Sequence, residues 1–259
     1  MKFFGALMGQ YEVVHALTIR ETRTRFGAHQ LGYLWALVEP ALMILTFYVL
    51  FAFAGRSAPT GMTLFSFIAT GICPFLIFSS TVTFVSNAIN GNKALLYYPQ
   101  VNPIDVVIAR VFLEFATYVG VFLVLLGLET LVLRKASVSD PLLIVYGFGL
   151  ASLLGAGLGL VFLGLGQLSN AMERARGPLM RPFFWVSGIF FTADGMPPQA
   201  RELVLWNPVL HTVELCRAGW FERYNDTHAT PSYALIWAVC LLLVGLLLER
   251  VVRRKIDLT

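Results

Sequence analysis

Long apolar stretches alternate along this chain with short polar ones, and the apolar stretches contain very few charged side chains. A helix needs about 20 apolar residues to cross the hydrocarbon core of a bilayer. Most of the stretches reach that length, so the pattern predicts an all-α integral membrane protein. The six predicted membrane-spanning helices cover residues 34–54, 62–86, 104–133, 141–168, 177–193 and 231–250.

Basic residues are distributed unevenly between the segments that separate these spans. If the N-terminus is cytoplasmic, the inner segments hold 13 of the 19 Lys and Arg residues, and the outer segments hold the other 6. Inner loops of membrane proteins carry an excess of these residues. Both termini carry basic clusters, so both are predicted to be cytoplasmic, and the number of crossings must be even.

The fifth predicted span, 177–193, is the least regular of the six. Its continuous apolar part is only about 13 residues long, which by length alone favours a re-entrant or buried segment. The even number of crossings nevertheless requires it to span, with help from the residues before it. The charged residues 169–176 are expected to form an inner loop.

Three polar segments complete the predicted organisation. Residues 1–33 predict an amphipathic helix in the cytoplasmic interface, because apolar positions share part of one surface and arginines gather near its end. Residues 87–103 form a polar connector with a short helical centre. Residues 194–230 alternate short amphipathic pieces with prolines, and are expected to dip into the outer leaflet as a periplasmic re-entrant hairpin. Residues 1–259 are therefore predicted to form a single membrane domain.

Composition narrows the class of protein further. Hydrophobic residues make up 57% of the chain and charged residues 13%, with a mean hydropathy of +0.72. A soluble domain carries about 25% charged residues and could not bury this much apolar surface. The net charge of +4 comes from basic residues at the ends of apolar segments, which excludes a broad nucleic-acid-binding surface. The first apolar run begins near Leu34, too far from Met1 for a cleavable secretory signal.

Sequence signatures of soluble enzymes are missing. The chain contains no G-x-x-x-x-G-K-[ST] phosphate loop, no H-E-x-x-H and no G-x-S-x-G. Its four histidines are scattered and its three cysteines have no metal-like spacing, so no metal site is expected. A membrane-embedded transferase would need acid–base residues gathered at one membrane face. The aspartates instead belong to different predicted loops: Asp105, Asp140, Asp194 and Asp226.

Within the predicted spans, small and ionisable residues are the informative ones. Gly155 and Gly159 are spaced as a packing pair that lets two helix backbones approach closely. Glu39 precedes Pro40, which leaves a nearby carbonyl unpaired and loosens the helix. The pair is interpreted either as a hinge or gate, or as a carboxylate held at the inner interface close to Arg25. Glu129, near the outer end of the third span, is expected to reach lipid headgroups.

Aromatic residues are dense in two of the predicted spans. Phe47, Tyr48 and Phe51 lie in the first span, and a second run lies in the fifth. Such rings ordinarily contact lipid or pack between helices. The alternative is a surface along which sugars glide, since ring faces stack on the C–H faces of sugars. The second run and the tryptophan near the start of the first span are Phe183, Phe184, Trp185, Phe190 and Trp35.

Residues 22–51 read TRTRFGAHQLGYLWALVEPALMILTFYVLF and resemble the opening of the membrane subunit of type-2 ABC exporters. The shared pattern is R-F-x(4)-L-G-x-L-W-x(4)-P, after an arginine-rich interfacial helix. NKALLYYPQVNP resembles the cytoplasmic coupling helix of that family, and Trp206-Asn207-Pro208 resembles an element of its periplasmic hairpin. The resemblance covers essentially the whole chain. The stretch from Leu95 to Pro99 is most similar to capsular-polysaccharide exporters.

The resemblance implies an assembly that composition alone does not indicate. Two copies of the chain would enclose a pathway in the bacterial inner membrane, and two copies of a separate ABC ATPase would dock on the cytoplasmic side. ATP and Mg would be bound by that ATPase, so no cofactor is expected in this chain. The implied cargo is an acidic, lipid-anchored polysaccharide passed to periplasmic and outer-membrane partners. The alternatives are an O-antigen, teichoic acid or drug exporter, a membrane-embedded transferase, and a passive channel.

The resemblance also assigns roles to residues. ATP-driven closure would tilt the first and fifth spans and open an aromatic-lined channel. The anionic lipid end of the cargo is expected at Arg20, Arg23 and Arg25, although membrane anchoring explains these arginines equally well. Coupling to the ATPase is assigned to Asn92, Lys93, Leu96, Tyr97, Tyr98 and Pro99. The channel lining is assigned to Trp35, Phe47, Tyr48, Phe51, Phe183, Phe184, Trp185 and Phe190.

Overall fold

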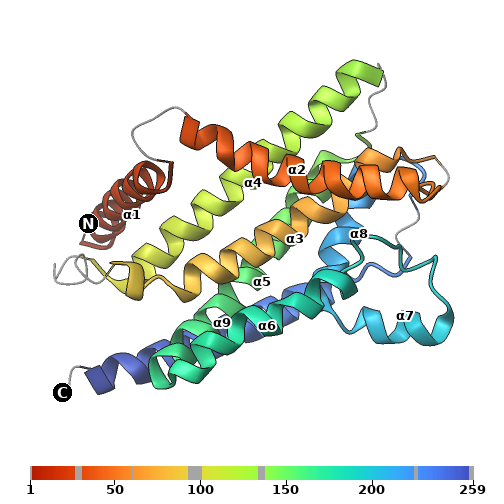
Figure 1. The fold of residues 1–259 in the computed structure, drawn as a ribbon. Helices are drawn as coiled ribbons and strands as arrows, with labels where there is room; N and C mark the ends of the chain where they lie inside the picture. The colour runs from red at the N-terminus through yellow and green to blue at the C-terminus, as the bar shows by residue number, and fades with distance from the viewer. Residues whose placement is uncertain are drawn as a thin grey trace.

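The computed structural model describes residues 2–26, 31–59, 61–92, 101–133, 138–224 and 227–256. These residues fold into helices joined by short connections and contain no strand, as the predicted all-α class requires (Figure 1). In chain order the elements are α1 (Lys2–Phe26), α2 (Leu31–Phe53), α3 (Leu64–Ser86), the 3₁₀ turn η1 (Asn90–Asn92), α4 (Pro103–Leu133), α5 (Pro141–Leu168), α6 (Asn170–Val186), α7 (Pro198–Leu205), α8 (Pro208–Trp220) and α9 (Pro231–Ile256).

Several helices begin at a capping side chain, which satisfies backbone N–H groups that have no partner within the helix. Asp140 caps α5 by accepting hydrogen bonds from the N–H groups of Leu142 and Leu143, and proline follows it at the first helical position. Asn207 and Pro208 start α8 in the same way. The proline costs nothing there, because its missing N–H would have had no helical partner.

Five helices in the described part of the chain are long and apolar enough to cross a membrane, namely α2, α3, α4, α5 and α9. They coincide with the predicted spans 34–54, 62–86, 104–133, 141–168 and 231–250 to within a few residues. The chain is therefore a multi-pass membrane protein by helix length and composition. α6, which holds the first part of the remaining predicted span, is 17 residues long.

The boundaries of α6 differ from those expected. Residues 169–176, predicted to be a loop, include the first turns of this helix, so that prediction is wrong. The reason is a local cap, because the Ser169 hydroxyl accepts a hydrogen bond from the N–H of Ala171 and the helix begins directly behind it. α6 then ends at Val186, inside the predicted span 177–193, and the chain bends through residues 187–191.

α5 lies at the centre of a bundle with α3, α8 and α9, here called the central bundle. Its glycines face three neighbours: a Cβ added at Gly147 would lie 2.7 Å from Cys216 Sγ of α8, and one added at Gly157 would lie 2.7 Å from Leu241 Cβ of α9. Gly155 and Gly159 both lie against α3. The predicted packing pair is therefore confirmed, and it belongs to a helix that closely approaches three others.

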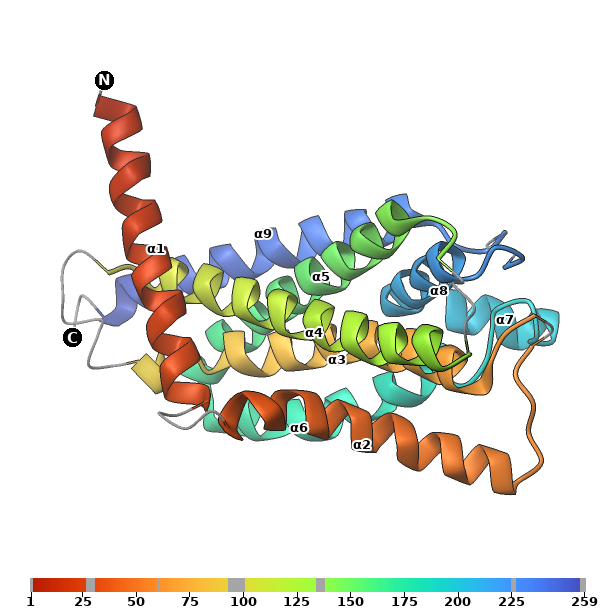
Figure 2. The ribbon, with the colours of Figure 1, turned by 90° about the horizontal axis from the view of Figure 1, so that it is seen from above.

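The remaining helices surround this bundle. α1 lies crosswise to the other helices, at the end of the molecule where the C-terminus lies (Figure 2). It packs on α4 through Leu17, which clusters with Val106 and Val107. α7 and α8 lie at the opposite end (Figure 2). α2 runs along the outside, and only 11% of its membrane-length window is buried within the chain.

Candidate functional site

Rings from α2, α6 and the bend after α6 meet around Phe190. The centroid of its ring lies 4.6 Å from Phe47, 5.3 Å from Phe51, 5.5 Å from Phe184 and 5.7 Å from Trp185. Tilted and edge-on contacts at these separations are favourable for aromatic rings, by about 0.5–1.5 kcal/mol per pair beyond the burial of area. These five residues are called the aromatic cluster below, and all five were predicted to line a channel.

The position of Phe190 depends on the bend that ends α6. Gly188 has φ of +75°, a conformation that residues with a Cβ rarely adopt, so glycine allows the chain to turn here. The side-chain amide of Asn207 donates to the carbonyl oxygen of Val186 (3.2 Å) and to the Ser187 hydroxyl (3.0 Å). The Asn-Pro motif at the start of α8 therefore also fixes the end of α6.

A buried arginine holds the other side of the same bend. Arg217 of α8 is fully buried and donates to the carbonyl oxygens of Phe191 (2.8 Å) and Ile189 (2.9 Å). Its guanidinium lies 4.2 Å from the ring centroid of Phe67 in α3, a cation–π contact. The bend that carries Phe190 is thus attached to both α8 and α3.

Glu214 partly balances the charge of this arginine. Its Oε1 lies 3.6 Å from Nη1 of Arg217, and the Tyr224 hydroxyl donates to its other oxygen. Burial raises the pKa of Glu214 above its usual value, while Arg217 and the hydrogen bond from Tyr224 act in the opposite direction. Arg217, Glu214 and Tyr224 therefore form a nearly closed polar unit, and removing one of the two charged members leaves a buried charge without compensation.

The other three predicted channel residues lie apart from the aromatic cluster. Phe183 faces Phe78 of α3 at 6.1 Å between ring centroids, and Tyr48 contacts Phe65 of α3 at the same separation. Trp35, at the inner part of α2, has 66% of its surface exposed. The structure therefore brings five of the eight predicted residues together, and the lining of a channel stays a prediction for all eight.

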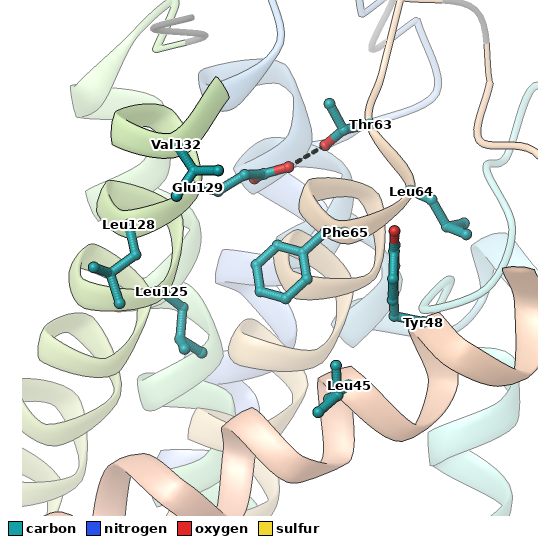
Figure 3. Close-up of a pocket in the computed structure, with 9 residues that line it drawn as sticks. All are labelled: Leu45, Tyr48, Thr63, Leu64, Phe65, Leu125, Leu128, Glu129 and Val132. Carbon is teal, nitrogen blue, oxygen red and sulfur yellow. Dashed lines mark hydrogen bonds between the residues drawn. The ribbon is translucent and has the colours of Figure 1, made fainter. Parts of the chain in front are cut away.

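Tyr48 instead lines an apolar cavity of about 570 Å³ between α2, α3 and α4 (Figure 3). Leucine side chains from all three elements form its walls, and Glu129 lies at its rim. The carboxylate of Glu129 accepts hydrogen bonds from the hydroxyls of Thr63 and Ser66, and its contact with lipid headgroups stays a prediction. Thr63 also caps α3, so its hydrogen bond to Glu129 ties the outer end of α4 to the start of α3.

At the end of the molecule that carries α1, residues with two different predicted roles lie in contact. Arg20, assigned to cargo entry, donates to the side chain of Asn92 (3.1 Å), which was assigned to ATPase coupling. Arg23 is exposed beside it, and both arginines line one shallow cleft on α1. The side chain of Arg25 and residues 93–100 lie outside the described residues. The coupling assignments to Lys93, Leu96, Tyr97, Tyr98 and Pro99 fall in that range.

The turn at residues 86–92, called the inner turn below, connects more helices than the sequence indicated. Asn90 accepts a hydrogen bond from Gln167 at the end of α5 (3.2 Å) and donates to Glu173 of α6 (3.4 Å). Arg176 of α6 donates to the hydroxyl of Ser86. With the contact from Arg20, the inner turn is bonded to α1, α5 and α6.

The Glu39–Pro40 pair does not interrupt α2, which is continuous from Leu31 to Phe53. Glu39 is exposed and Pro40 is buried. Both interpretations of this pair, the hinge and the interfacial carboxylate, stay predictions. Among the residues that the structure describes, no group of three His, Cys, Asp or Glu side chains could hold a metal ion.

Comparison with known families decides what kind of membrane protein this is. A family model described as "ABC-2 type transporter" matches residues 12–221, which cover most of the chain. The chain belongs to this family. The match includes the described parts of α2 to α6, the bend and α8, so the aromatic cluster and the inner turn are both part of the ABC-2 domain.

Individual relatives of this ABC-2 protein include polysaccharide exporters. The polysialic acid transport protein KpsM of Escherichia coli is 33% identical over 241 residues, which are 93% of each chain. The capsule polysaccharide export inner-membrane protein CtrC of Neisseria meningitidis serogroup B is 28% identical over 94% of this chain and 92% of its own. The O-antigen export system permease protein RfbA of Klebsiella pneumoniae is 23% identical over 91% and 90%. The family resemblance inferred from residues 22–51 is confirmed.

Proposed function

We propose that this chain is the membrane permease subunit of an ABC transporter that exports lipid-linked capsular polysaccharide across the inner membrane. The observation that carries the proposal is the match with capsule exporters over more than nine-tenths of both chains. O-antigen export is the second candidate, favoured by the weaker match with an O-antigen permease. In either case the chain transports and does not itself catalyse a reaction.

The proposed assembly contains two copies of this chain and two copies of an ABC ATPase, which would bind ATP and Mg. Closed two-fold assemblies are the commonest among homo-oligomers. The exposed face of α2 leaves surface available for a second copy. Periplasmic and outer-membrane proteins would receive the polysaccharide after it leaves the inner membrane.

In the proposed topology both termini are cytoplasmic and the chain crosses the membrane six times. α6 and the bend after it, ending near residue 193, provide the fifth crossing. Residues 194–230, with α7 and α8, form the periplasmic re-entrant hairpin, and α1 lies in the cytoplasmic interface. The crosswise position of α1 and the location of α7 and α8 at the opposite end of the molecule support this arrangement (Figure 2).

The aromatic cluster is the proposed gate of the sugar path. Its rings join α2 to the bend after α6. Rings of this kind offer flat apolar faces to sugar C–H groups without binding any one sugar tightly. Movement of α2 away from the bend would separate the rings and open the path.

The inner turn is the proposed relay between the ATPase and this gate. It directly precedes residues 93–100, which the family resemblance assigns to ATPase contact. Its hydrogen bonds to α1, α5 and α6 would carry a displacement of that segment to the helix that ends at the aromatic cluster.

The proposal is tested first by deleting the gene in its native host and complementing it with a tagged copy. The deletion is expected to remove surface polysaccharide and to leave lipid-linked polymer inside the cell. Chemical analysis of that polymer distinguishes capsule from O-antigen. The tagged protein should co-purify with a near-stoichiometric ATPase that carries a phosphate loop. Normal surface polysaccharide in the deletion strain would refute the proposal.

Topology is tested separately with a cysteine at Gln199, in α7, in a variant that lacks the native cysteines. An impermeant thiol reagent added to spheroplasts should label this position. A cysteine at Met172, in the inner part of α6, is the matched control and should be labelled only after the membrane is disrupted. The reverse pattern would contradict the proposed orientation.

A further inference from the structure

A second cavity, of about 530 Å³, lies beyond the aromatic cluster at the end of the molecule that carries α7 and α8. Three segments enclose it: the end of α2 with the loop after it, the start of α3, and the bend after α6. Its walls are polar and apolar in similar measure, unlike those of the cavity in Figure 3. The residues that matter for its chemistry are Phe51, Arg56, Ser57, Phe190 and Thr192.

The cavity continues directly from the aromatic cluster. Phe51 and Phe190 belong to both, with 5.3 Å between their ring centroids. A polysaccharide that left the aromatic cluster between α2 and the bend would therefore enter this cavity next. Phe67 and Phe191 add two further rings to its walls.

Arg56 is the one basic residue among those that line the cavity. Its guanidinium carbon lies 5.0 Å from the centroid of the Phe51 ring. Within the described residues, the guanidinium donates no hydrogen bond and forms no ion pair. No acidic side chain lines the cavity, so the positive charge of Arg56 is not neutralised there.

Two other arginines at this end of the molecule make the contrast clear. Arg217 is engaged by two carbonyl oxygens and Glu214. Arg201 donates to the carbonyl oxygens of Ala193 (2.9 Å), Asp194 (3.2 Å) and Met196 (3.0 Å). Both serve the folded structure of the hairpin. Arg56 has the same donor groups, but it is exposed, lines the cavity and has no protein acceptor for its guanidinium in the described structure.

These features select a ligand by its chemistry. A guanidinium presents a planar fork of donors that matches a carboxylate. Beside it, the ring faces suit the C–H surface of a sugar, and the hydroxyls of Ser57 and Thr192 suit sugar hydroxyls. The Thr192 oxygen already accepts a hydrogen bond from the N–H of Gly195 (3.2 Å), so its own proton is available for donation. One sugar residue that bears a carboxylate can contact the guanidinium, the ring faces and the hydroxyls at the same time.

We propose that this cavity is an exit-side subsite that holds one acidic sugar residue of the exported polymer, with Arg56 binding its carboxylate. This proposal rests on the proposed polysaccharide export. It adds a selection by charge after the aromatic cluster, which itself treats acidic and neutral sugars alike. The continuity with the aromatic cluster favours a sugar over a lipid headgroup as the occupant.

The test uses the complex with its ATPase, in nanodiscs of phosphatidylcholine. The probes are short oligosaccharides cut from the host's own surface polysaccharide, and the same oligosaccharides with their carboxyl groups reduced to alcohols. Binding of each is measured by saturation-transfer NMR or calorimetry. Wild-type complex should bind the acidic form about tenfold or more tightly than the reduced form, as a charge-assisted bidentate contact predicts.

Variants at two arginines then show which arginine causes the preference for the acidic form. Arg56→Gln should bind both forms as weakly as wild type binds the reduced form, and Arg56→Lys should recover part of the preference. Arg223→Gln is the matched control, because Arg223 is exposed on the same predicted side but does not line the cavity. It should keep the full preference. Co-purification of the ATPase with each variant verifies that the complex is intact.

Two results would overturn the inference. If Arg56→Gln keeps the preference for the acidic form, the carboxylate binds elsewhere, although polysaccharide export still stands. If the acidic form is displaced from wild type by phosphatidylglycerol in the nanodisc, and Arg56→Gln abolishes that competition, the cavity is a lipid-headgroup site. Failure of the export proposal would look different, because deletion of the gene would then leave surface polysaccharide unchanged.

Discussion

α5 and α2 are both apolar enough to cross a membrane, yet the chain holds them in opposite ways. In α5, 67% of the membrane-length window is buried within the chain, against 11% in α2. The backbone of α5 approaches three neighbours at glycines, whereas α2 is joined to the bend after α6 through aromatic rings. Close packing at glycines permits little displacement, while rings can slide and part.

This difference assigns separate tasks to the two regions. The central bundle around α5 is a fixed frame, and its helix α8 is fastened to the bend by buried hydrogen bonds. α2 is the element with the fewest internal restraints among the candidate spans. In a transporter that opens and closes, we expect the frame to determine stability and α2 to determine activity.

The largest effect on stability is expected from Arg217→Met in the fixed frame. The change keeps much of the volume but leaves Glu214 buried without its cation and the carbonyls of Ile189 and Phe191 without their donor. Removing one partner of a buried pair costs about 3–5 kcal/mol. The measurement is the unfolding free energy in detergent micelles. Arg223→Met, at an exposed position, is the control and should change it by less than about 0.5 kcal/mol.

A smaller effect on stability is expected from Gly157→Ala, where α5 meets α9. An alanine Cβ at Gly157 would lie 2.7 Å from Leu241 Cβ, so the helices must separate. Such overpacking costs about 1–3 kcal/mol. Gly149 in the same helix has nothing within 4 Å of an added Cβ, and Gly149→Ala should be neutral or slightly stabilising. Equal thermal midpoints for the two variants would show that the α5–α9 contact is not tight.

The fixed frame should also respond to pH through Glu214. Burial raises its pKa in the folded state, so the folded chain holds the proton more tightly than the unfolded chain. The resulting stabilisation is fully present below the unfolded value of about 4.3 and is lost as pH rises through the folded pKa. Above pH ~4.5, the thermal midpoint of wild type should therefore fall relative to that of Glu214→Gln. An opposite slope would mean that Arg217, rather than burial, dominates the pKa.

The smallest effect on stability is expected at the ring contacts of α2. Phe190→Leu keeps most of the apolar volume and should cost about 1 kcal/mol or less, yet export should fall strongly because α2 loses its ring contacts with the bend. Spin labels at Val49 and Val186 should show a broader distance distribution in this variant. Labels at Val145 of α5 and Ile236 of α9 should not change. Equal broadening of both pairs would remove the distinction between frame and α2.

Hydropathy and charge were sufficient to predict the helical class and five membrane-length helices, because the bilayer imposes a length on apolar segments. The spacing of Gly155 and Gly159 predicted a close helix contact, which the structure confirms. These signals are local, so they can be read along a single stretch of chain. The charged residues 169–176 were misread because a serine cap outweighs their polarity.

The contacts that define the candidate site are not local. Arg20 meets Asn92, and Glu129 meets Thr63, across more than 60 residues of sequence in each case. Arg217 was counted only as an outer positive charge. Its position three residues after Glu214, in a largely apolar stretch, was a signal for an internal ion pair. Periodicity identifies which face of a helix is apolar, but it does not identify the helix that covers this face.

The way α2 is held also has a consequence for the order in which the protein is made. α2 leaves the ribosome before α3 and α6, so its partners in those helices do not yet exist. A helix that depends so little on internal contacts can rest in lipid alone while the rest is synthesised. Arg217 cannot do so, because its guanidinium is held by carbonyl oxygens of the bend and lies against Phe67 of α3. Its helix comes late in the chain, after α3 and the bend that receive it have been synthesised.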